Sequence, residues 1–207
     1  MPGCTWGARP AQGVSFSPCY NAVMLISTKF THADLLEAPD DGKRREIVEG
    51  ELFVTPSPNL DHQRISRRIG SALANYLEAN PIGEIFYAPM DVILTDFDVV
   101  EPDLLIVLNE HREILKTWVE GTPDLVVEIL SPTTSKRDRG LKLRAYARHG
   151  VAEYWIVDPD QRAIEVYRLD RERYHAPQVF REPEALSSPL LPSFSLPLAG
   201  VFNPRGG

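Results

Sequence analysis

The sequence predicts a single α/β or α+β domain in which a mixed β-sheet is flanked by helices. Two short apolar runs, Leu104–Leu108 and Leu125–Leu130, have the length and composition of buried strands. Apolar residues recur at helical spacing between Ile65 and Leu77, and a basic segment from Ser135 to Gly150 has the pattern of a second long helix. Helices placed before and after groups of strands are typical of a mixed sheet with helical cover.

Length and composition agree with one domain carrying tails. The 207 residues are 43% hydrophobic and 25% charged, as in an ordinary globular protein. No apolar run approaches the roughly 20 residues that span a bilayer, so we expect no membrane partner. A net charge of -7 argues against a general nucleic-acid coat, unless positive charge gathers on one face. Cys4 and Cys19 are the only cysteines, which excludes a thiol nucleophile or zinc ribbon downstream and favours a reducing cytoplasm.

Residues 1–23 differ in character from the rest of the chain. They contain no acidic residue, Arg9 as their one basic residue, and six Pro and Gly residues. We therefore expect a disordered leader before a single domain over residues 24–207. An over-long start ahead of Met24 and an organelle leader are the alternatives.

The N-terminal half of the domain supplies a small helix, a hairpin and a longer helix. Thr31 and Asp34 have the spacing of a capping box, which predicts a short helix through Ala38. The segment 46–54 predicts a hairpin with Glu49-Gly50 at its tip. The helix containing Ile65–Leu77 is expected to end at Asn80-Pro81.

The remaining elements are mostly strands. Candidates before the two apolar runs are 84–88 and 91–94, and a strand at 153–159 follows the basic helix. The segments 163–169 and 179–181 are expected as antiparallel additions. The proline-containing tail beyond them is expected to wrap the surface in extended form.

One carboxylate stands inside an apolar strand. Burying Glu128 costs free energy unless a metal or a cation compensates its charge. Asp124 lies on the same strand face but about 13 Å away, too far to share an ion, so it is interpreted as a polar residue at the start of the strand. Asp103 precedes the other apolar run, and if the two strands are neighbours it converges with Glu128 on a divalent cation. The alternative is that Glu128 pairs with a buried Arg or Lys.

The helix after Glu128 is strongly basic. Ser135 and Asp138 have capping-box spacing, and Asp138, Lys142 and Tyr146 recur every four residues, on one face. Six cations accompany Asp138: Lys136, Arg137, Arg139, Lys142, Arg144 and Arg148. Such a helix either presents a solvated surface or places a phosphodiester over a metal, with Lys142 stabilising charge or activating water.

These motifs resemble the Uma-two family, a restriction-endonuclease-like branch of the PD-(D/E)XK nuclease superfamily. The resemblance covers about residues 30–200 and rests on the following segments: Pro102-Asp103, Pro123–Pro132, Asp138, Lys142, Tyr146 and Gly150–Trp155, with Glu46, Glu49-Gly50, Pro56–Pro58 and His62 upstream. It implies a restriction-endonuclease-like core with an N-terminal hairpin and antiparallel C-terminal additions.

The resemblance also implies a site. Asp103 and Glu128 would bind Mg²⁺ or Mn²⁺, with Glu46 as a candidate third carboxylate or, alternatively, an exposed strand residue. The lysine expected two residues after Glu128 is replaced by Leu130, so Lys142 is the candidate lysine and Lys136 the reserve. The other implied residues are His62, Lys136, Arg137, Arg139 and Arg144 as substrate contacts, although His62 has a helix-cap or surface alternative, and Ser131, Asp138 and Tyr146 in support.

The predicted function is metal-dependent endonucleolytic hydrolysis of DNA. The first alternative is a catalytically silent module of the same fold that binds a partner or forms a homodimer. A glycosidase-like carboxylate pair ranks last, because no aromatic residues cluster near Glu128 before Tyr146.

Overall fold

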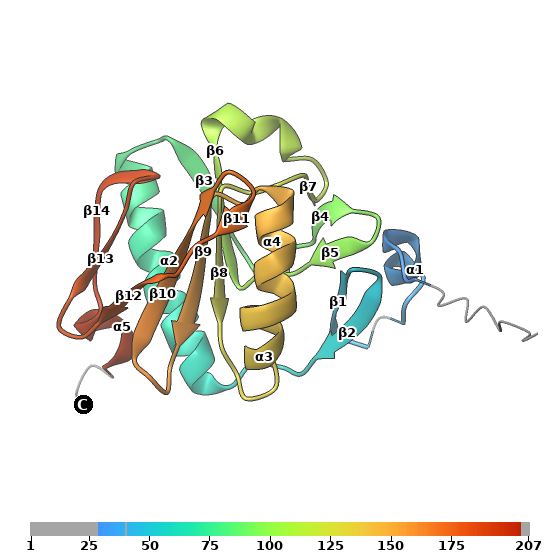
Figure 1. Cartoon of the computed structure of the whole chain (residues 1–207), viewed down its shortest axis with the longest axis horizontal. Coiled ribbons are helices and arrows are strands. Elements are labelled where there is room, and N and C mark those ends of the chain that lie inside the picture. The colour runs from blue at the N-terminus through green and yellow to red at the C-terminus, as the bar shows by residue number, and fades with distance from the viewer. Residues whose placement is uncertain (1–28, 40, 204–207) are drawn as a thin grey trace, which may run out of the picture.

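The computed structural model describes residues 29–39 and 41–203, shown in Figure 1. The predicted leader, residues 1–23, therefore lies outside the described residues. The architecture is a mixed α+β domain built on one large sheet, as predicted. None of the helices in the described ranges is long and apolar enough to cross a membrane.

The large sheet contains seven strands in the order β11-β10-β9-β8-β6-β3, with β12 beside β10. Their bounds are β3 Gly83–Tyr87, β6 Leu104–Leu108, β8 Leu125–Ile129, β9 Glu153–Asp158, β10 Ala163–Asp170, β11 Arg173–Tyr174 and β12 Gln178–Arg181. The neighbours β8 and β9 are parallel, whereas the other pairs in this sheet are antiparallel. Parallel neighbours require a crossover, and the basic helical segment provides it.

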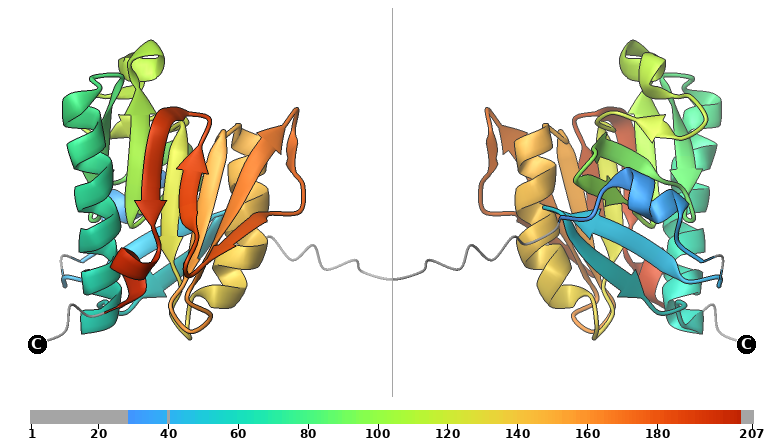
Figure 2. Two further views of the ribbon diagram at one scale, coloured as in Figure 1. Left: turned by 90° about the vertical axis from the view of Figure 1, so that its left-hand side faces the viewer. Right: turned by 90° about the vertical axis from the view of Figure 1, so that its right-hand side faces the viewer.

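Helices cover both faces of this sheet (Figures 1 and 2). The long helix α2 (Leu60–Ala79) lies on one face, and the continuous crossover of α3 (Ser135–Arg137), the π-helical turn η2 (Asp138–Lys142) and α4 (Leu143–His149) lies on the other. Successive strand residues alternate between these faces. In β8, Val127 packs on the α2 side and Val126 on the α4 side. Glu128 therefore projects toward the crossover helices.

A smaller sheet has the order β2-β1-β5-β4-β7. Its strands are β1 Arg44–Val48, β2 Glu51–Thr55, β4 Val92–Thr95, β5 Asp98–Val100 and β7 Val119–Glu120. The predicted hairpin is confirmed, since Glu49 and Gly50 form its tip with φ of 56° and 82°. The strands β5 and β7 are absent from the prediction, because two or three residues are too few to show a period.

The two predicted capping boxes have different outcomes. At α1 (His32–Leu36) the Thr31 backbone N–H donates to Asp34 Oδ2 at 2.7 Å, which confirms the first. The second prediction is wrong, because the N-cap of α3 is Thr134 and not Ser135. A short 3-10 segment, η1 (Asn109–Ile114), links β6 to β7.

The prediction of an extended C-terminal tail is also wrong. The chain forms a hairpin of β13 (Ala185–Ser188) and β14 (Leu191–Pro197), followed by α5 (Ala199–Phe202). Leu186 and Phe194 of this hairpin are buried in the core beside α2. Its prolines do not prevent pairing, since Pro192 and Pro197 take exposed positions of a two-stranded sheet.

Candidate functional site

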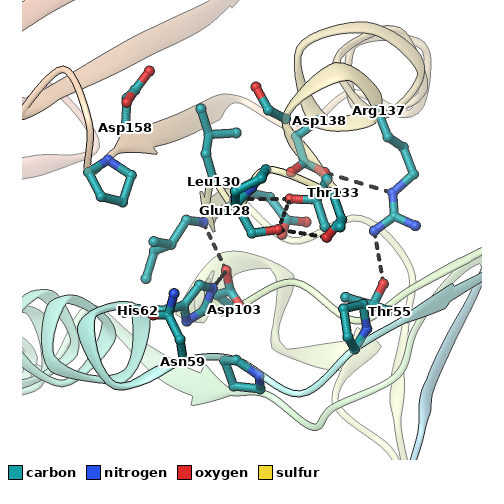
Figure 3. Close-up of a pocket in the computed structure, with 18 of the residues that line it drawn as sticks. Thr55, Asn59, His62, Asp103, Glu128, Leu130, Thr133, Arg137, Asp138 and Asp158 are labelled. Atoms are coloured by element: carbon teal, nitrogen blue, oxygen red, sulfur yellow. Dashed lines mark hydrogen bonds and ion pairs between the residues drawn. The ribbon is translucent and has the colours of Figure 1, made fainter.

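A pocket of about 650 Å³ opens where β8 meets the crossover helix and the start of α2 (Figure 3). The antiparallel register pairs Leu104 with Val127, which sets Asp103 opposite Glu128. Asp103 Oδ2 accepts a hydrogen bond from the Ile129 backbone N–H at 2.8 Å, and this bond fixes the carboxylate at the strand end. The structure thus brings the two predicted carboxylates to one place.

Lys142 joins this site from the π-helical turn. Its Nζ lies 2.6 Å from Glu128 Oε1 and 2.5 Å from Glu46 Oε1, and its side chain is 1% exposed. The Tyr146 hydroxyl donates to the same Glu128 oxygen at 2.9 Å. Lys136 is exposed and does not line the pocket, so Lys142 is the lysine that reaches the carboxylates. Glu128 therefore has a buried cationic partner, the arrangement considered above as the alternative to a metal.

Two basic side chains contact Asp103. His62 Nε2 lies 3.1 Å from Asp103 Oδ2, and His62 is placed by the Asn59 cap, whose side chain accepts from the His62 backbone N–H at 2.9 Å. Arg44 Nη1 lies 3.2 Å from Asp103 Oδ1. Sequence reasoning missed Arg44; the available signal was alternation in β1, which puts Arg44 on the same face as Glu46.

Negative charge exceeds positive charge in this site. The carboxylate cluster consists of five buried groups: Glu46, Glu101, Asp103, Glu128 and Asp138. Among residues 29–39 and 41–203, three permanent cations pair with it: Arg44, Arg137 and Lys142. The cluster therefore lacks two positive charges before His62 is counted.

The pKa directions follow from this excess. Burial, reinforced by the carboxylates of Asp138, Asp103 and Glu46, raises the pKa of Glu128 although Lys142 opposes the shift. Burial also raises the pKa of Asp138. For Glu46 the opposing effect of burial is outweighed by Lys142 and Arg137, so its pKa is lowered. Burial and the neighbouring carboxylates thus favour the protonated form of Glu128, whose pKa they raise to about 8.

A hard divalent cation fits this donor set. Both recorded bonds of Glu128 use Oε1, and within the described ranges Oε2 accepts no hydrogen bond. The enclosed oxygens Glu101 Oε2 and Asp138 Oδ1 accept no hydrogen bond in the described structure. Each lies near a guanidinium nitrogen, at 3.4 Å from Arg44 Nε and 3.9 Å from Arg137 Nε respectively. Mg²⁺ and Mn²⁺ prefer oxygen ligands, and two positive charges would balance the cluster.

Of the three arginines predicted to contact phosphates, two pair with carboxylates and one is exposed outside the pocket. Arg137 Nη2 lies 3.0 Å from Glu46 Oε2, and Arg139 Nη2 lies 2.6 Å from both Asp158 Oδ2 and Glu165 Oε1. Arg144 is exposed and lies outside the pocket lining. Ser131 lines the pocket, where its backbone N–H and hydroxyl lie 3.3 and 3.2 Å from Thr134 Oγ1.

Asp124 has a local structural role at the far end of β8. It accepts from the Leu108 backbone N–H at 2.7 Å, and its other oxygen lies 2.8 Å from His111 Nδ1. Together with Glu110 these side chains offer ligand atoms within 4.8 Å of one another. Since both Asp124 oxygens already hold the β6–η1 junction, the group is explained by the fold.

A family comparison decides where this arrangement belongs. The model of the Uma2 family, described as "Putative restriction endonuclease", matches residues 32–199. The chain belongs to this family. The matched region contains all five members of the carboxylate cluster and Lys142.

The chain is also similar to a solved structure and to a curated relative. The fold is similar to that of "a putative nuclease belonging to DUF820" from Anabaena variabilis, with a TM-score of 0.72, 22% identity, and coverage of 84% of this chain and 97% of that one. The chain is also 28% identical over 127 residues to the Synechocystis sp. protein named "Uncharacterized protein slr1290". The match covers 60% of this chain and 66% of the length of the relative.

Proposed function

We propose that this member of the Uma2 family is a divalent-metal-dependent endonuclease that hydrolyses DNA phosphodiester bonds. The observation that carries the proposal is the convergence of Asp103 and Glu128 beside the buried Lys142. The family membership supports a nuclease, and the surplus of carboxylates supports a divalent cation. A site of action in the cytoplasm agrees with the absence of cysteine from residues 24–207.

Asp103 and Glu128 would hold Mg²⁺ or Mn²⁺, whereas Glu46 is engaged by Lys142 and Arg137 and would help position them. The bound ion would supply Lewis-acid stabilisation of the charge that develops on the phosphate. The chain's own residues fix the geometry: the Ile129 backbone N–H orients Asp103, and the Tyr146 hydroxyl orients Glu128.

The electrostatics favour one role for Lys142 over another. Burial opposes its charge, but Glu128, Glu46 and Asp138 outweigh burial and raise the pKa of Lys142 above its ordinary value. A lysine that stays protonated cannot remove a proton from water at neutral pH. Lys142 therefore acts by electrostatic stabilisation of the phosphoryl oxygens and by holding Glu128 in place.

A catalytically silent module is the second candidate, and one observation favours it. Lys142 and Arg137 already pair with Glu128 and Glu46, so these two buried carboxylates have cationic partners without a metal. Such a module would bind DNA or form a homodimer without cleaving.

Cleavage of supercoiled plasmid DNA separates the two candidates. We expect nicking by the wild-type protein in Mg²⁺ or Mn²⁺ and none in a chelator. Asp103→Asn and Glu128→Gln should abolish it, and Lys142→Arg should lower the rate about 10²-fold or more, because guanidinium differs from ammonium in shape. The control Asp124→Asn changes a carboxylate of the same strand face outside the site and should leave cleavage intact. DNA binding without cleavage in either metal would identify the silent module.

A further inference from the structure

A second hollow continues from the pocket along α2. It measures about 870 Å³ and is lined by the start of α2 together with residues from β1, β2 and the segment after β3. The two hollows share the following residues: Arg44, Thr55, Ser57, Pro58, His62 and Asp103. A ligand in the first pocket can therefore extend into the second without leaving the surface.

Exposed cations line this extension. Arg64 and Arg67 lie three residues apart on α2, hence on one face, and both are exposed. Arg64 pairs with Asp61 at 2.9 Å, but both side chains are exposed and such a pair contributes about 0–1 kcal/mol. Arg67 makes no recorded ion pair within the described ranges. Both arginines also line a third hollow beside β14 and α5, so they form a ridge between two grooves.

The crossover helix offers less free positive charge at the pocket. Arg137 and Arg139 line the pocket, but buried or partly buried carboxylates hold them. The chain carries a net charge of -7, so a polyanion needs a local surface of positive charge in order to bind. Exposed arginines beside the pocket that have no buried carboxylate partner among the described residues provide such a surface.

The spacing along α2 also fits a nucleic-acid strand. His62 contacts Asp103 in the site, and Arg67 follows five residues later, about 7.5 Å along the helix axis. This distance corresponds to about two nucleotide steps of 3.4 Å along the axis of a B-DNA duplex that runs parallel to α2. Polar side chains accompany the arginines in the groove, among them Gln63 and Ser71.

We propose that DNA flanking the cleaved bond runs along α2, with Arg64 and Arg67 binding its backbone phosphates irrespective of sequence. This inference rests on the proposed function, since it places the substrate by continuity with the Asp103–Glu128 pocket. It moves the main backbone contact from the crossover helix, where the sequence predicted it, to the opposite side of the pocket.

The test is equilibrium binding of a labelled DNA duplex as a function of salt, with EDTA present so that no cleavage occurs. Arg64→Ala and Arg67→Ala should each weaken binding and lower the slope of log K against log salt by about 0.9. Arg112→Ala removes an exposed arginine of η1, at the far end of β6, and should change neither quantity.

The outcomes are distinguishable. Unchanged affinity and slope in both α2 variants, beside a wild-type protein that binds and cleaves, would overturn this inference and leave the proposed function standing. Loss of the slope in Arg144→Ala with no effect of the α2 variants would place the DNA over the crossover helix and also overturn it. A wild-type protein that binds no duplex would remove the proposed function and this inference with it.

Discussion

Replacement of Lys142 by methionine tests the electrostatic balance of the site. Lys142 contacts Glu46 and Glu128 at 2.5 and 2.6 Å, and the change leaves two buried carboxylates without their shared cation. Removing one partner of a buried ion pair costs about 3–5 kcal/mol. Glu46 keeps Arg137 at 3.0 Å, and Glu128 keeps the Tyr146 hydroxyl and can take up a proton. We therefore expect about 3 kcal/mol, the lower end of that range.

The assay is chemical denaturation of the wild-type and variant proteins in a chelator. Because Lys142 and Arg137 outweigh burial and hold the pKa of Glu46 below its ordinary value, the stability lost in Lys142→Met is fully present above pH of about 4.5, the ordinary glutamate value, and the difference from the wild type should shrink as pH falls below it. Adding Glu46→Gln to the variant removes one unpaired carboxylate and should recover part of the loss, which a double-mutant cycle measures. A Lys142→Met protein within about 1 kcal/mol of the wild type would refute the ion-pair argument.

Two further predictions concern stability away from the pocket. Burial opposes ionisation of Asp98, but His149, the Glu49 backbone N–H and Arg148 outweigh it and lower its pKa to about 2. The stability that Asp98 contributes is present above pH of about 3.8 and is lost as pH falls toward 2. Asp98→Asn should therefore cost about 2 kcal/mol at neutral pH, and urea denaturation should show a weaker loss of stability between pH of about 4 and 2 than in the wild type. Gly150 ends α4 with φ of 87° and open space around its Cα, so Gly150→Ala should destabilise by about 1 kcal/mol through backbone strain alone. Gly140→Ala within the same crossover helix, where φ is helical, should instead be neutral or stabilising by up to about 1 kcal/mol; equal thermal shifts in the two variants would contradict the strain argument.

Much of the site could be predicted from the sequence because strand geometry is periodic. One charged residue in an apolar run identified Glu128, and the register of the adjacent strand then brought Asp103 opposite it. Lys142 followed from helical spacing, although the π-helical turn that carries it left no signal in the pattern. The predictable part of the site is the part that depends on the repeat of residues along a strand or a helix.

The remainder depends on contacts between distant segments. Arg44 begins β1, where alternation shows the face it takes, but its pairing with Asp103, 59 residues away, has no local signature. The C-terminal hairpin was missed because its prolines indicated an extended tail, whereas packing of its apolar residues against α2 determines its structure. The engagement of Arg137 and Arg139 by carboxylates could not be inferred either, since their partners come from β1, β9 and β10.

A calorimetric titration of Mn²⁺ into the metal-free protein tests the central claim most directly. We predict one binding event in the wild type that Asp103→Asn and Glu128→Gln each abolish, with thermal melting showing that both variants stay folded. His111→Ala, which removes a ligand atom from the Glu110–His111–Asp124 group, should bind Mn²⁺ as the wild type does. Equal Mn²⁺ affinity in the wild type and in Glu128→Gln would contradict a metal site at Asp103 and Glu128.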